Sequence, residues 1–471
     1  MTPLKNKIKN KTARIAIIGQ GYVGLPLALQ ACRAGFFVCG IDKDKSKIDA
    51  LRSGKSYIDD IKNDDVAAAI KSKKFQPTAS FDILSQADVI IIAVPTPLDK
   101  FHIPDLTYIK EATGEIARRL RPHQLIILES TTYPGTTEEV VLPILAKCQM
   151  SNVNPENFRG KSKIQNPKQI KRGQNLFLAF SPERVDPGNK KFNTKNTPKV
   201  VGGVNKKSTD LATLFYNQII DKVVPVSSAR AAEMTKLLEN IFRIVNISMI
   251  NELALLCGKM KIDIWEVIEA AATKPYGFMP FYPGPGIGGH CIAVDPFYLS
   301  YKAREYGFFT RFIDLAGEIN ELMPHYVVTT VATALNYSQA KSIKNAKILL
   351  MGISYKKDIK DTRESAAYKI AETLLQKGAK LSFYDPYISK FQIQNLKFQI
   401  NSKSQIQNSK LQIHIPKIKK LTKSIIQNFD AALIITDHSG IDYEQIAKWA
   451  KAVVDTRNAV RSRKFKNVYR L

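Results

Sequence analysis

The chain has 471 residues, of which 44% are hydrophobic and 24% charged, a composition typical of a globular protein with two or three domains. The 70 Lys and Arg residues against 42 Asp and Glu give a formal net charge of +28, which by itself would indicate a nucleic acid or an anionic membrane as partner. Five cysteines without a CxxC pair argue against a disulfide framework and a zinc site and favour a reducing compartment.

The charge is unevenly distributed along the chain. Nearly all of it lies in the four segments 1–14, 148–200, 390–424 and 456–471. The rest is close to neutral, so we expect no specific nucleic-acid partner. No stretch approaches the roughly 18 apolar residues that span a bilayer, and the start does not resemble a signal peptide. We therefore expect a cytoplasmic protein without a membrane partner.

Residues 1–215 predict a doubly wound parallel sheet, with a basic insertion near 148–172. Apolar runs bounded by turn residues alternate with helical patterns, as in βα units. The predicted strands cover 15–19, 37–41, 89–94, 125–128, 176–180 and 200–204.

The first predicted strand leads into a dinucleotide-binding fingerprint. Gly19 permits a tight turn, Gly21 lets the backbone approach a pyrophosphate, and Gly24 allows close helix packing. The helix N-terminus then offers free N–H groups to the phosphates. Asp42, at the end of the next strand, would bind ribose hydroxyls, which favours NAD over NADP although Lys43, Lys45 and Lys47 lie nearby.

Polar clusters follow other strands of this sheet, at 95–97, 130–132 and 181–183. Ligands in such sheets bind at the carboxyl ends of the strands. Each cluster alone could instead be turn chemistry or a helix cap, which is the more common role of Ser and Thr at such positions.

Residues 216–330 predict a helical central domain. The stretch 229–271 has helical periodicity, and its exposed apolar face predicts a homodimer or higher homo-oligomer. Lys236 and Asn240 lie one turn apart on the same helix face, so they either point together at a ligand or form a solvated surface pair.

A loop over 280–296 contains four glycines and four prolines, which excludes a helix or central strand. It places the thiol of Cys291 beside His290 and close to Asp295, a candidate nucleophile with acid/base groups. The other cysteines stand on apolar elements and are predicted to be inert core residues: Cys32, Cys39, Cys148 and Cys257.

Residues 331–471 predict a second, smaller Rossmann-like sheet domain. Its predicted strands cover 346–352, 380–385, 431–436 and 452–455. A degenerate Gln-Ile repeat over 391–413 interrupts them and predicts a solvated low-complexity insertion near 390–424. The fold class is thus α/β, with two Rossmann-like doubly wound sheets joined by a helical domain.

Six motifs in this order resemble the UDP-glucose/UDP-N-acetylhexosamine 6-dehydrogenase family, over about residues 12–460. They are GQGYVGLPLA, STTYPGT, SPERVDPG, AEMTKLLEN, GPGIGGHCIAVDP and GISYKKDIKDTRES.

The resemblance implies two successive NAD-dependent oxidations at C6 of a UDP-sugar, from alcohol through aldehyde to carboxylate. It implies that Cys291 forms a thiohemiacetal and then a thioester, which a water hydrolyses. Lys236 would stabilise the oxyanion, Asn240 would orient the sugar, and Asp295, with Glu183, would help activate the water.

The resemblance also implies the remaining contacts. Thr131 would hold an active-site water. The cofactor side comprises Gly19, Gly21, Tyr22, Val23, Gly24, Asp42, Lys47, Thr96, Thr131 and Arg363. The substrate side comprises Glu183, Arg184, Lys236, Asn240, Tyr282, Gly288, Lys356 and Arg457. No metal is implied.

Two departures from the glucose branch bear on the substrate. Pro187, with Asp186 beside it, stands where that branch has a second Glu, and Val294 stands where it has a Lys before Asp295. The Val-Asp-Pro ending resembles the N-acetylhexosamine branch. The sequence KPYGFMPFYPGPG resembles the UDP-N-acetylglucosamine branch more than the UDP-N-acetylmannosamine branch, so we expect UDP-N-acetylglucosamine as substrate, with UDP-N-acetylmannosamine and UDP-glucose as alternatives. The resemblance also implies that the product acid feeds polysaccharide biosynthesis.

Two other functions stay open. A two-electron hydroxyacid dehydrogenase would share the first sheet and the helices, but would need neither the cysteine loop nor a second sheet. A non-enzymatic nucleic-acid-binding protein would use the +28 charge.

Overall fold

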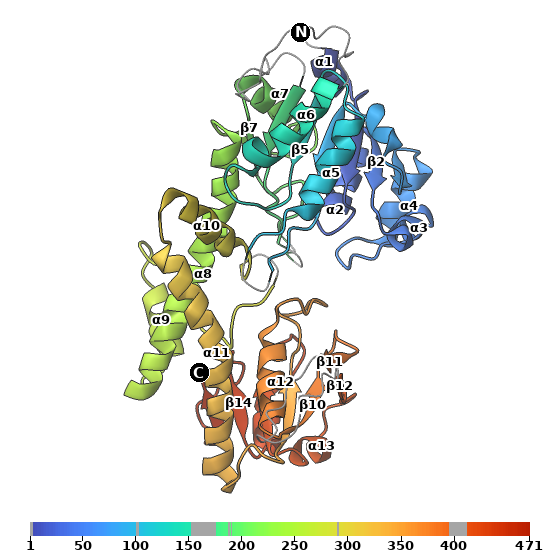
Figure 1. Ribbon diagram of the computed structural model, residues 1–471. Coiled ribbons are helices and arrows are strands. Elements are labelled where there is room, and N and C mark those ends of the chain that lie inside the picture. The colour runs from blue at the N-terminus through green and yellow to red at the C-terminus, as the bar shows by residue number, and fades with distance from the viewer. Residues whose placement is uncertain are drawn as a thin grey trace, which may run out of the picture. The chain divides into compact units, whose positions relative to one another are not determined.

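The protein, in a computed structural model, is described over residues 3–99, 103–151, 176–186, 189, 191–289, 292–394 and 412–471 (Figure 1). It divides into two compact units, described separately below. The first contains Met1–Glu239 and Phe297–Phe308, and the second contains Asn240–Pro296 and Phe309–Leu471.

An eight-stranded sheet forms the centre of the first unit, in the order β3-β2-β1-β4-β5-β6-β7-β8. Neighbouring strands are parallel except β6 and β7, which are antiparallel. The strands are β1 (Arg14–Ile18), β2 (Phe37–Ile41), β3 (Phe75–Thr78), β4 (Val89–Ile92), β5 (Gln124–Leu128), β6 (Leu176–Phe180), β7 (Lys199–Gly203) and β8 (Val223–Pro225). The order reverses between β1 and β4, which is where such sheets bind ligands.

Both faces of this sheet are apolar because successive strand residues point to opposite sides. Ile15 and Ile17 pack into one buried cluster, and Ala16 and Ile18 into another. Helices cover the sheet (Figure 1): α1 (Pro3–Lys9), α2 (Gly24–Arg33), α3 (Lys45–Arg52), α4 (Asn63–Lys71), α5 (Thr107–Arg118), α6 (Leu142–Ser151) and α7 (Lys206–Tyr216).

A five-stranded parallel sheet forms the centre of the second unit, in the order β10-β9-β13-β14-β15. Its strands are β9 (Lys347–Met351), β10 (Lys380–Tyr384), β13 (Ala431–Ile434), β14 (Val453–Asp455) and β15 (Val468–Arg470). A separate antiparallel ribbon joins β11 (Phe391–Ile393) and β12 (Ile413–Ile415).

The remaining helices complete the two units. They are α8 (Ala229–Met260), α9 (Ile264–Ala272), α10 (Asp295–Ala303), α11 (Arg311–Gln339), α12 (Ala366–Gln376), α13 (Lys423–Gln427) and α14 (Tyr443–Trp449). The predicted fold class is confirmed: two mainly parallel sheets with a long helical segment between them in the sequence.

The ten predicted strands are present with boundaries shifted by at most two residues. Strands β3, β8 and β15 were missed because they have only three or four residues and are partly exposed. The predicted low order of the Gln-Ile segment is wrong at its two ends. Phe391 and Ile393 of β11 and Ile415 of β12 are buried in the core of the second unit. The middle of that segment lies outside the described residues.

Helix α8 corrects the expectation that no stretch is long and apolar enough to span a bilayer. It has 32 residues and a mean hydropathy of 1.5 over an 18-residue window, so by length and composition alone it could cross a membrane; 28% of that window is buried. Its polar residues pack within the second unit: Ser248 Oγ donates to Ala316 O at 2.9 Å, and Asn251 Oδ1 accepts from Gly284 N at 2.9 Å. These contacts are those of a helix packed against protein.

Candidate active site

The turn after β1 has the geometry that the fingerprint predicts. Gly19 has φ +93°, and a Cβ there would lie 2.2 Å from Ala93 O. A Cβ on Gly24 would lie 1.8 Å from Gly19 O, whereas a Cβ on Gly21 would meet nothing within 4 Å. Gly19 and Gly24 thus permit the backbone packing, and the space at Gly21 is open for a pyrophosphate.

Asp42 is held in place at the end of β2. Its Oδ2 accepts from Gln20 N at 2.9 Å and lies 3.4 Å from Lys47 Nζ. The side chain keeps 12% exposure, so a ribose could reach it. Together with the open backbone at Gly21 and the N-terminus of α2, these residues fit NAD.

Two glycine variants separate folding from cofactor binding. Gly19→Ala should lower the free energy of unfolding by about 3 kcal/mol, because its Cβ meets a backbone carbonyl at a positive φ. Gly21→Ala should keep its melting temperature yet bind NADH about ten-fold more weakly, since its Cβ enters only the ligand space. Thermal melts and NADH fluorescence titrations measure the two effects; equal loss of stability in both variants would contradict the assignment.

The loops after β4 and β5 are tied together. Ser130 Oγ donates to Val94 O at 2.7 Å and accepts from Val94 N at 2.9 Å. Thr96 is buried, and its carbonyl oxygen accepts a hydrogen bond from the Tyr298 hydroxyl. Thr131, the predicted water-holding residue, is half-buried in this region.

Glu233, which the sequence analysis missed, anchors the same loop to α8. The residue is fully buried; its Oε2 accepts from Gly135 N at 2.6 Å, and its Oε1 accepts from Thr137 N at 2.9 Å and Thr137 Oγ1 at 2.7 Å. Lys236 follows three residues later on the helix. Burial raises the pKa of Glu233 to about 7, against the opposing effect of these hydrogen bonds.

The raised pKa predicts a pH dependence of stability. Folding raises the pKa of Glu233 from 4.5, so its contribution to stability is complete below pH 4.5 and is lost as the pH rises through 7. The loss is about 3 kcal/mol. Glu233→Gln should therefore flatten the decrease of unfolding free energy over this range in urea titrations at several pH values. The exposed Glu252→Gln on the same helix should not, and an unchanged slope in Glu233→Gln would refute the prediction.

Glu183 and Lys236 meet in the first unit. Lys236 Nζ donates to Glu183 O at 2.6 Å. Arg184 pairs with Glu239 at 2.6 Å and donates to Pro198 O at 2.7 Å, so it braces the loop. Asp186 is exposed and accepts from Asn189 Nδ2 at 3.3 Å. Pro187, at the position of the second Glu of the glucose branch, lies outside the described residues.

Asn240 and Asp295 meet in the second unit. Asp295 is buried at the start of α10, and its Oδ2 accepts from Asn240 Nδ2. Arg243 donates to the amide oxygen of Asn240 and so fixes which end of the amide faces Asp295. The predicted nucleophile Cys291 and its neighbour His290 lie outside the described residues.

The glycine-rich loop that leads to Cys291 packs on the loop after β9. Gly289 N donates to Arg363 O at 3.0 Å, and a Cβ on Gly288 would lie 2.7 Å from Tyr355 Cβ. A Cβ on Gly284 would lie 2.6 Å from Arg457 Nη1. Gly288 thus permits a close approach that a Cβ would block, and Gly284 leaves space for the Arg457 guanidinium.

The predicted substrate residues Arg457, Lys356 and Tyr282 and the predicted cofactor residue Arg363 also lie in the second unit. Burial lowers the pKa of Arg457, whose Nε donates to Ile435 O at 2.8 Å, while Asp437 and Asp455 favour its charge. Lys356 O accepts from Ser354 Oγ at 3.1 Å. Arg363 is exposed and pairs with Asp361 at 2.6 Å. Tyr282 stacks on Trp265, with ring centroids 5.7 Å apart.

His438 and Asp385 also support the loop after β9, and no motif pointed to either. Nδ1 of the buried His438 accepts from Asp358 N at 3.0 Å, so Nε2 carries the proton and lies 3.1 Å from Asp385 Oδ2. Burial would raise the pKa of Asp385, but hydrogen bonds from His438 and Ile353 N lower it to about 2. This buried pair fixes the backbone beside Lys356.

Two of the cysteines predicted to be inert have the expected surroundings. Cys32 and Cys39 are buried, and burial raises their thiol pKa values to about 12 and about 11. Cys257 is half-buried, and the Cys148 side chain lies outside the described part of the chain. In that part, no group of three or more His, Cys, Asp or Glu residues could hold a metal ion.

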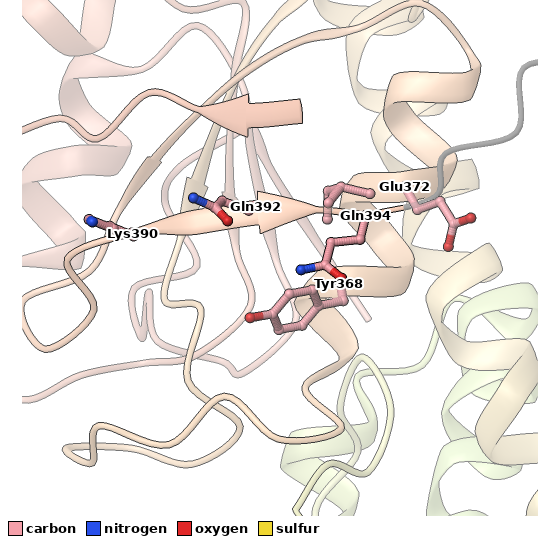
Figure 2. Close-up of a pocket in the computed structure, with 6 residues that line it drawn as sticks. Tyr368, Glu372, Lys390, Gln392 and Gln394 are labelled. Carbon is pink, nitrogen blue, oxygen red and sulfur yellow. The ribbon is translucent and has the colours of Figure 1, made fainter. Parts of the chain in front are cut away.

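A cavity of about 460 Å³ lies beside α12 and β11 (Figure 2). The described residues that line it are Tyr368, Glu372, Lys390, Gln392, Ile393 and Gln394. None of these is a predicted site residue, so this cavity is distinct from the site that the motifs define.

Comparison with known proteins defines the class. Three models of the UDP-glucose/GDP-mannose dehydrogenase family match the chain: the NAD binding domain over residues 13–220, the central domain over 230–322 and the UDP binding domain over 349–462. The chain belongs to this family. It is an NAD-dependent nucleotide-sugar dehydrogenase, and the UDP binding domain supports a UDP-sugar as its substrate.

Individual relatives differ in the sugar that their names give. The chain is 34% identical to a UDP-N-acetyl-D-glucosamine 6-dehydrogenase of Pseudomonas aeruginosa over 80% of this chain and 84% of that protein. It is 28% identical to a UDP-N-acetyl-D-mannosamine dehydrogenase of Methanococcus vannielii over 96% and 94%. The solved structure of a UDP-D-ManNAc dehydrogenase from Pyrococcus horikoshii covers 97% of this chain and 98% of its own, with 29% identity and a TM-score of 0.80.

Proposed function

We propose that the protein oxidises C6 of a UDP-N-acetylhexosamine to the carboxylate in two NAD-dependent steps, with UDP-N-acetylglucosamine as the preferred substrate. UDP-N-acetylmannosamine and UDP-glucose are the alternatives. Relatives named for the glucosamine and mannosamine sugars match this chain at similar identity. The Val294-Asp295-Pro296 sequence favours an N-acetylhexosamine over glucose.

The observation that carries the proposal is that both flanks of Cys291 are fixed. Before it, Gly289 N donates to Arg363 O at 3.0 Å. After it, Asp295 is buried and accepts from Asn240. Hydrogen bonds on both sides of Cys291 are what a loop that carries a nucleophile requires, and they support the role proposed for this residue.

The residues take the following roles. NAD, when bound, accepts one hydride in each oxidation. The Cys291 thiolate adds to the C6 aldehyde to give a thiohemiacetal, which loses hydride to become a thioester. Lys236 stabilises the oxyanion, and Asn240 orients the sugar. Asp295, with Glu183, accepts a proton from the water that attacks the thioester carbon, after which the carbon–sulfur bond breaks and releases the acid.

The test is the yield of NADH per sugar. Spectrophotometric assays with UDP-N-acetylglucosamine, UDP-N-acetylmannosamine, UDP-N-acetylgalactosamine and UDP-glucose should give two NADH per sugar consumed, with the highest kcat/KM for the first. Cys291→Ala should form no acid, measured by mass spectrometry of the product. One NADH per sugar would indicate a two-electron hydroxyacid dehydrogenase, and normal acid formation by Cys291→Ala would defeat the cysteine mechanism.

We also propose that a second copy of the chain covers α8. Met249, Leu253, Leu256 and Met260 repeat at helical spacing and are 40% to 58% exposed. An apolar stripe of this kind is typical of a helix that packs against a partner. For the protein as a whole, we propose a cytoplasmic enzyme that has no nucleic-acid or membrane partner.

The stripe can be tested by charge insertion. The double variant Leu253→Glu, Leu256→Glu should convert a dimer or higher oligomer to monomers in multi-angle light scattering, because a charge at the centre of an apolar interface is desolvated. Ile103→Glu, at an exposed apolar residue of the first unit, is the matched control and should leave the oligomer intact. An unmodified chain that is monomeric and active would refute this proposal.

A further inference from the structure

Three side chains that no motif singled out lie buried behind the loop of Glu183. Lys199 is the first residue of β7, Glu129 follows β5, and Tyr216 ends α7. The side chains of Lys199 and Glu129 are 7% and 0% exposed, and Tyr216 is fully buried. All of them belong to the first unit.

Lys199 is the cation that two carboxylates share. Its Nζ lies 3.1 Å from Glu129 Oε1 and 3.8 Å from Glu183 Oε2. The Tyr216 hydroxyl donates to the same Oε1 of Glu129, and Lys199 Nζ lies 5.1 Å from the Tyr216 ring centroid. Glu129 and Tyr216 therefore restrict where the ammonium group can be.

This arrangement is costly for a protein that needs only stability. Burial raises the pKa of Glu129, against the opposing charge of Lys199. Within the described residues, Glu129 Oε2 has no hydrogen-bond partner. Buried ion pairs of this kind can often be replaced by apolar residues without loss of stability, so a positional role is the better explanation.

Lys199 contacts both the backbone and the carboxylate of the Glu183 loop. Lys199 Nζ donates to Pro182 O at 3.3 Å, while Lys236 Nζ donates to the next carbonyl, Glu183 O, at 2.6 Å. Glu183 Oε1 accepts from the backbone N–H groups of Arg184 and Val185 at 2.8 Å and 2.6 Å. Lys199 Nζ lies 3.8 Å from the other oxygen, Oε2, of this carboxylate.

We propose that Lys199 is a positioning residue, held by Glu129 and Tyr216, that orients the Glu183 carboxylate and compensates its charge. The inference rests on the proposed function, in which Glu183 helps to activate the water that hydrolyses the thioester. Loss of Lys199 should therefore slow hydrolysis more than either hydride transfer.

Stopped-flow measurement of NADH separates these steps. Lys199→Met should show a burst of two NADH per active site followed by slow turnover, with the ratio of burst rate to steady-state rate raised about ten-fold or more over that of the unmodified chain. Lys199→Arg keeps the charge and should restore the normal ratio. Lys207→Met, at an exposed position of α7, is the matched control and should leave the ratio unchanged.

A double variant tests whether Lys199 acts through Glu183. Lys199→Met added to Glu183→Gln should lower the steady-state rate less than two-fold further, because the group that it positions is already altered. If Lys199→Met fails to fold in thermal melts, Lys199→Gln replaces it, since a neutral side chain with an amide donor can still reach Pro182 O.

The outcomes distinguish this inference from the proposed function. An unmodified chain that makes no NADH from any UDP-sugar would refute the proposed function. If the unmodified chain is active, the role of Lys199 is overturned by an unchanged ratio in the neutral Lys199 variant or by equal slowing of burst and turnover. It is also overturned by an additive loss in the double variant, or if Lys199→Arg does not restore the ratio.

Discussion

The loops of both units depend on carboxylates at the carboxyl ends of parallel strands, which accept hydrogen bonds from the loop backbone. Backbone N–H groups that leave a sheet there have lost their ladder partners and need an acceptor. Asp42 accepts from Gln20 N at 2.9 Å in the first unit, and Asp385 accepts from Ile353 N at 2.6 Å in the second. The ligand-facing loops are therefore fixed by the chain itself.

The turns after β1 and β9 have similar backbones but differ in the exposure of their carboxylates. Gly352 repeats Gly19, with φ +81° and a virtual Cβ 2.2 Å from the carbonyl oxygen of a neighbouring strand end. Asp42 keeps 12% side-chain exposure, whereas Asp385 has none and is covered by His438. Of the two carboxylates, only that of Asp42 can contact a ribose directly, so the second sheet repeats the backbone of a dinucleotide site without its ribose-binding acid.

The sequence predicted the parts of this structure that depend on local pattern. Apolar runs located β1 and β9, and the glycine spacing located the cofactor turn. The edge strand β15 was missed because three partly exposed residues carry too weak a periodic signal. Glu129 and Lys199 could not be predicted together, since they lie 70 residues apart and meet only when β5 and β7 are placed in one sheet. Motifs thus identify groups that contact ligands, but not the buried groups that hold them.

The effect of a charged residue depends on where it lies in the structure and not only on how many such residues the chain has. Exposed lysines such as Lys191 and Lys419 act through water and salt, which screen their charge over about 8–10 Å. Arg457 acts differently, because burial disfavours its charge while a ligand phosphate would stabilise it at contact distance. Lys199 and Lys236, at 3.3 Å and 2.6 Å from successive carbonyl oxygens, bind the backbone of the loop that carries Glu183. The net charge of +28 therefore says little about what any single cation contacts.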